Sequence, residues 1–128
     1  MKRILLACFL LTATCTVSFV QHATAQSSST TLADFTAKVN LLDSYIGAGD
    51  TTNMRVTWTA VHTMMLNVLR VSKVSIQTAT TPADKSAHIA ILDNQRTLYT
   101  TIWSLKNNMV ANRVTLHSKL GDFGATIY

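Results

Sequence analysis

The chain has 128 residues, of which 48% are hydrophobic and only 13% are charged, and its formal net charge is +5. All six acidic residues are Asp, which excludes both the Glu-x-x-His pattern of di-metal bundles and the His-Glu-x-x-His pattern of zinc proteases. The basic residues after position 3 are scattered singly, which argues against nucleic-acid binding. The chain has only four glycines and no Gly-x-Ser-x-Gly motif, so we expect neither catalysis nor a cofactor.

Residues 1–25 have the order of a secretory signal peptide. A Lys-Arg pair precedes the apolar run Ile4 to Leu11, and small residues stand before the expected cleavage site between Ala25 and Gln26. The sequence therefore predicts a periplasmic or secreted protein with no transmembrane segment after cleavage.

Two alternatives to cleavage remain open. An uncleaved membrane anchor needs about 20 predominantly apolar residues, but threonines and a serine interrupt this run from position 12 onward. Lipid modification of Cys8 is the other alternative, although only four apolar residues precede that cysteine. Cleavage after Ala25 would remove both cysteines and leave 103 residues, 26–128, which is long enough for a single helical domain without thiols.

The mature segment is predicted to be an all-α, up-down bundle of three helices, at about 32–46, 52–78 and 82–120. Apolar residues recur every three or four positions in each segment, which is typical of a helix with one buried face. Thr31 and Thr81 occupy predicted N-cap positions with an Asp three residues further on, and glycines separate the first two helices.

The third helix is expected to be long and to carry a coiled-coil-like seam, which includes Gln95 and Asn112 as polar positions that specify register. If unbroken, it would extend roughly 58 Å at 1.5 Å per residue, well beyond its neighbours. A break near Asn107 and Asn108 would instead give four helices, and the tail from Phe123 to Tyr128 is another candidate cover for the projecting end.

An uncovered apolar end favours self-association or an envelope protein partner. The predicted interaction residues are Met109, Val110, Val114 and Leu116. The function expected from this pattern is binding or self-assembly in the cell envelope.

A second hypothesis is a small ligand carrier that binds copper or haem. The predicted metal ligands are His62, Met65, His88 and His117, because neutral imidazole and thioether groups are suitable ligands for copper and haem iron. No His-x-x-x-His spacing supports this hypothesis, and methionines at core spacing are usually packing residues.

Overall fold

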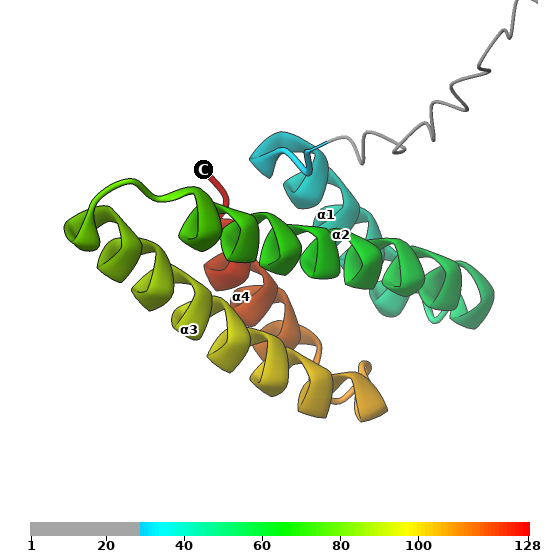
Figure 1. Cartoon of the computed structure of the whole chain (residues 1–128). Coiled ribbons are helices and arrows are strands. Elements are labelled where there is room, and N and C mark those ends of the chain that lie inside the picture. The colour runs from blue at the N-terminus through cyan, green and yellow to red at the C-terminus, as the bar shows by residue number, and fades with distance from the viewer. Residues whose placement is uncertain (1–28) are drawn as a thin grey trace, which may run out of the picture.

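A computed structural model describes residues 29–128 as an all-α bundle (Figure 1). Its helices are α1 (Leu32–Ala48), α2 (Thr51–Thr78), α3 (Pro82–Leu105) and α4 (Arg113–Gly124), with a short 3-10 helix, η1 (Lys106–Asn108), after α3. The predicted all-α class is confirmed. The predicted signal peptide and its cleavage site lie outside the described residues.

Local side-chain chemistry sets the helix starts, as the sequence predicts. The hydroxyl oxygens of Thr31 and Thr81 accept hydrogen bonds from the backbone N–H groups of Asp34 and Asp84, each at 3.1 Å. Each cap satisfies one of the backbone donors that a helix N-terminus leaves free. After α1, Gly49 turns the chain with φ of 68°, a conformation that favours glycine.

The prediction of one continuous helix over 82–120 is wrong, and the alternative, a break near Asn107 and Asn108, is confirmed. The α-helix ends at Leu105, and the Asn112 side chain donates a hydrogen bond to the Leu105 carbonyl at 3.0 Å. The Asn108 side chain accepts one from the Ala111 N–H at 3.2 Å. Asparagine side chains therefore replace helical backbone bonds across the break.

The break lets α4 fold back, so that each of the four helices packs against two others. The buried apolar core draws on all four helices: Phe35, Val39, Leu42, Ile46, Trp58, Val61, Met65, Val68, Ile102, Leu116, Leu120 and Phe123. Leu116 is only 1% exposed, so its predicted place on an uncovered end is wrong. It packs inside the chain because α4 covers the core between α1 and α3.

The end of α4 lies close against α1. The rings of Phe35 and Phe123 lie 5.7 Å apart, and a Cβ added at Gly124 would come within 3.2 Å of the Phe35 ring. This close approach brings the segment that follows α4 against the bundle. Within residues 29–128, no helix combines the length and the apolar character needed to cross a membrane.

Candidate ligand-binding cleft

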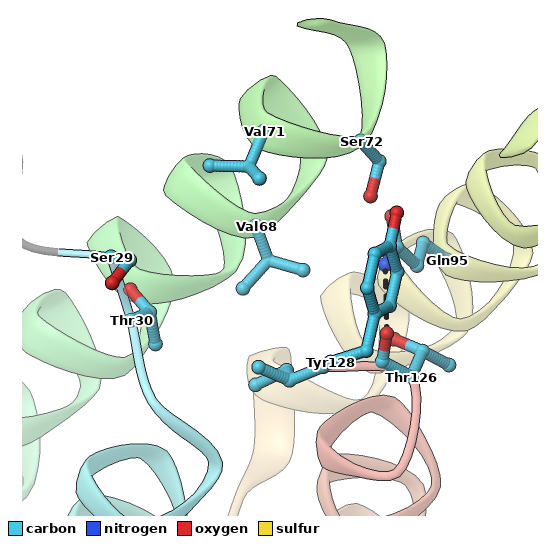
Figure 2. A pocket seen from close by; sticks show the side chains of 9 residues that line it. Ser29, Thr30, Val68, Val71, Ser72, Gln95, Thr126 and Tyr128 are labelled. Carbon is cyan, nitrogen blue, oxygen red and sulfur yellow. Dashed lines mark hydrogen bonds between the residues drawn. The ribbon is translucent and has the colours of Figure 1, made fainter. Parts of the chain in front are cut away.

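A cleft lies where α2, α3 and the segment after α4 meet (Figure 2). We call it the C-terminal cleft, and its lining residues are Ser29, Thr30, Val68, Val71, Ser72, Gln95, Thr126, Ile127 and Tyr128. Its volume is about 40 Å³. A cavity of roughly 10 to 15 Å³ holds one water molecule, so the cleft has space for about three water molecules or for a ligand of that size.

Gln95 is the central polar residue of the cleft. It lies on α3, its side chain is 0% exposed, and its Nε2 donates a long hydrogen bond of 3.4 Å to the backbone carbonyl of Thr126. No atom of residues 29–128 hydrogen-bonds to its Oε1. A buried acceptor without a partner costs about 1 to 3 kcal/mol, so most such groups in proteins are paired. Gln95 therefore lines the cleft and carries an unpaired acceptor that is itself buried.

Ser72 is the second buried polar residue of the cleft, and it comes from α2. Its side chain is 2% exposed, and Figure 2 shows its hydroxyl pointing toward the side chains of Gln95 and Tyr128. A hydroxyl both donates and accepts hydrogen bonds. The isopropyl groups of Val68 and Val71 also line the cleft from α2, so polar and apolar surfaces meet there.

The segment after α4 forms the third wall. The Thr126 N–H and hydroxyl both donate to the Phe123 carbonyl, at 3.0 and 2.7 Å, which holds the Thr126 backbone next to Gln95. Further on, the Tyr128 hydroxyl hydrogen-bonds to His88 Nδ1 at 3.3 Å, and the two rings stack with centroids 6.1 Å apart. This contact joins the chain's last residue to the first turns of α3.

The structure does not bring the four predicted metal ligands together. His62 Nε2 hydrogen-bonds to the Tyr99 hydroxyl at 2.9 Å, and Met65 is buried in the core. His88 lies beside the C-terminal cleft, whereas His117 lies on α4 beside α1. Among the described residues, no group of three or more His, Cys, Asp or Glu side chains is placed to hold a metal ion.

His117 lies instead beside an ion pair between α1 and α4, formed by Asp43 and Arg113. The Arg113 guanidinium donates two hydrogen bonds to the Asp43 carboxylate, at 2.8 and 2.7 Å, and this pairing lowers the pKa of Asp43. His117 Nδ1 lies 4.0 Å from the same carboxylate and has no hydrogen-bond partner within residues 29–128. The bidentate pair joins residues 70 positions apart and fixes α4 against α1.

An aromatic cluster between α2 and α3 escaped the sequence analysis. The His62 ring lies 6.4 Å from Trp58, 5.9 Å from Tyr99 and 5.0 Å from Trp103, and Lys106 Nζ lies 3.9 Å from the Trp103 ring centroid. The spacing of four between Trp58 and His62, and between Tyr99 and Trp103, is the sequence signal for it. Because its rings contact one another, the cluster mainly joins the two helices.

The predicted interaction surface is smaller in the structure. Val110 and Val114 are 63% and 83% exposed, but Met109 packs against the core and Leu116 is buried within it. Of the four predicted interaction residues, only the two valines are therefore exposed to solvent.

The lining of the C-terminal cleft offers hydroxyl, carboxamide and alkyl groups, a set suited to holding a ligand by hydrogen bonds and apolar contact. Sequence reasoning singled out Gln95, but it did not join it with Ser72, Thr126 and Tyr128. Comparison of the chain with known protein families, curated proteins and solved structures gave no match.

Proposed function

We propose that this chain is an exported helical-bundle protein that binds a small ligand in the C-terminal cleft without transforming it. The observation that carries the proposal is Gln95, which lines the cleft and whose buried Oε1 has no hydrogen-bond partner within residues 29–128. A ligand that donates to this oxygen removes the cost of leaving it unpaired, so binding is favoured at this position.

Ligand titrations followed by amide NMR test the proposal. Four small probes, 2-propanol, acetone, acetamide and acetate, cover neutral and charged molecules with and without donors. We expect at least one of them to shift the resonances of Ser72, Gln95 and Tyr128 along a saturable curve. Resonances that stay in place with every probe would refute binding in the cleft.

Two matched variants locate the binding. Ser72→Val places an extra methyl group and no hydroxyl in the cleft, so we expect it to weaken the saturable shifts. Ser118→Val makes the same change on the exposed side of α4 and should leave them unchanged. Equal binding by Ser72→Val and the unmodified protein would place the ligand elsewhere.

The export part of the proposal is supported by the basic start, the apolar run and the Ala25–Gln26 junction. Intact mass measurement of the protein from an envelope extract tests it directly. A chain that begins at Gln26 agrees with cleavage, whereas a retained N-terminus or a lipid attached to Cys8 contradicts it.

The proposal does not use copper or haem, because the four predicted ligands have separate surroundings. Absorption spectra and metal analysis of the purified protein distinguish the two functions. Stoichiometric copper or haem that is lost in His62→Ala would favour the carrier hypothesis over this one.

Self-association stays a prediction, and in the structure it depends on Val110 and Val114. Because Leu116 is buried, the apolar surface available at this end is small. Sedimentation of the protein over a range of concentrations tests the prediction. A monomer throughout would reject it, while a dimer weakened by Val110→Ser but not by Val56→Ser, the same change at an equally exposed position of α2, would place the contact.

A further inference from the structure

We propose that the outer face of α2 binds the surface of a membrane that contains anionic phospholipids. This face is defined by three exposed basic residues and three exposed apolar residues, Arg55, Arg70 and Lys73 with Val56, Leu66 and Val74. The proposal goes beyond the proposed function and does not depend on the C-terminal cleft.

The outer face follows from the spacing of residues along α2. From Val56 to Gln77, exposed residues recur at alternating spacings of three and four, which places them in one row along the helix. The opposite side of α2 carries Trp58, Met65 and Val68 into the core. Figure 1 shows α2 on the outside of the bundle, in front of α1. No part of residues 29–128 therefore covers the row.

The positive charge of the described chain is concentrated on α2. Residues 29–128 contain nine basic and six acidic side chains, so their net charge is +3. α2 contains three basic residues and no acidic residue, so this single helix has a charge of +3. In α1 and α4 together, three basic residues are balanced by three acidic residues. Two of the three basic residues there are in ion pairs, Arg113 with Asp43 and Lys119 with Asp122.

Apolar side chains stand among the basic residues of the outer face. Val56, Leu66 and Val74 are 63%, 46% and 45% exposed. They lie on the same helix face as the cations, so a surface that binds this face meets both kinds of side chain.

Trp103 extends the surface from α2 onto α3. It is 41% exposed, and its ring centroid lies 5.0 Å from that of His62, which is one turn before Leu66 on α2. Lys106 Nζ lies 3.9 Å from the Trp103 ring centroid. Tryptophan is enriched at membrane–water interfaces, and basic side chains there bury their alkyl stems while the charge stays near the headgroups. Both side chains therefore suit a phospholipid surface.

Charge complementarity selects the membrane among the possible occupants. The surface of a membrane with anionic lipids has a negative potential that attracts Lys and Arg side chains. A second copy bound through the same face would bring two charges of +3 together, and they would repel. The phosphates of a nucleic acid would attract the cations but would leave the three aliphatic side chains exposed to water. A phospholipid surface accepts both the cations and the apolar groups.

Sedimentation with lipid vesicles, using the protein from an envelope extract, tests the proposal. Vesicles of phosphatidylcholine alone are compared with vesicles of an equal mixture of phosphatidylcholine and phosphatidylglycerol. We expect binding to the mixed vesicles at low salt, binding to the neutral vesicles that is at least about tenfold weaker, and release from the mixed vesicles as salt is added. No binding to the mixed vesicles, or equal binding to both kinds, would overturn the proposal.

Two matched pairs of variants locate the contact. Lys73→Gln should weaken binding to the mixed vesicles about fivefold, the loss expected for one basic residue near an anionic surface, whereas Lys119→Gln on α4 should change it less than about twofold. Val56→Ser should weaken binding about threefold, whereas Val114→Ser, the same change at a more exposed position of α4, should not weaken it. Equal effects within either pair would overturn the assignment to α2.

Duplex DNA distinguishes a membrane site from a general site for polyanions. We expect Val56→Ser to weaken binding to the mixed vesicles and to leave any binding to DNA unchanged. If Val56→Ser leaves vesicle binding unchanged while Lys73→Gln weakens binding to DNA and vesicles equally, the face is a polyanion site and the proposal is wrong. Because both positions are exposed, both variants should fold, and thermal unfolding checks this.

Discussion

Replacing Gln95 with Met should stabilise the fold. Methionine has nearly the length and shape of glutamine, so it fills the same space without an unpaired acceptor. The change affects two polar interactions, the unpaired Oε1 and the 3.4 Å hydrogen bond from Nε2 to Thr126. The sign of the effect depends on which of them contributes more.

The magnitude follows from these two contributions. An unpaired buried acceptor costs about 1 to 3 kcal/mol, whereas an intramolecular hydrogen bond stabilises by about 0.5 to 1.5 kcal/mol. At 3.4 Å the Gln95–Thr126 bond belongs at the weak end of that range. Gln95→Met should therefore raise the free energy of unfolding by about 1 kcal/mol, which for a domain of this size raises the Tm by about 4 to 8 °C.

Thermal and urea unfolding of Gln95→Met measure this change, with Gln77→Met as the control. The control places the same side chain at an exposed site and should stay within about 0.5 kcal/mol of the unmodified protein. A lower Tm for Gln95→Met would refute the reasoning, because it would show that Oε1 is already satisfied in solution. Higher stability combined with weaker binding in the cleft is the pattern expected where function is maintained at the expense of stability.

Three further changes test how α4 is held against the rest of the bundle. The hydrogen bond from Arg113 lowers the pKa of Asp43 below its ordinary 3.8 in the folded protein. The pair's contribution to the free energy of unfolding is therefore present above the pKa of the unfolded chain and is lost as the pH falls through the folded pKa. As the pH is lowered, the free energy of unfolding should fall less for Arg113→Gln than for the unmodified protein. Asn112→Ala removes the hydrogen bond to the Leu105 carbonyl and should cost about 0.5 to 1.5 kcal/mol in urea unfolding, and an unchanged midpoint would contradict that role. Phe123→Ala removes a fully buried ring and should cost about 3 to 5 kcal/mol by the same measurement, far more than any surface change.

Much of the helical architecture could be predicted because its determinants are local. The caps at Thr31 and Thr81 depend on residues three positions away, and the turn after α1 depends on Gly49. The apolar spacing of α1 and α2 also predicts their buried faces. These features need no knowledge of distant parts of the chain.

The end of α3 could not be fixed from the pattern because the apolar spacing continues across the break. Leu105, Met109 and Leu116 keep the spacing of a helix, so periodicity alone supports one long element. The break instead depends on Asn112, whose side chain reaches seven residues back to the Leu105 carbonyl. Burial of Leu116 against α1 and α3 then favours the folded-back arrangement, and this tertiary contact overrides the local pattern.

The sequence alone does not distinguish Gln95 from Asn112, the two polar seam positions of the predicted third helix. Both Gln95 and Asn112 are expected to specify register, yet the structure gives them different roles. Asn112 pairs with the Leu105 carbonyl and ends α3, so its polarity serves the fold. Gln95 uses only its donor on Thr126, and its acceptor has no partner within residues 29–128. A residue selected only for register gains stability by pairing both ends, so the unpaired acceptor of Gln95 is the feature that the proposed binding function would explain.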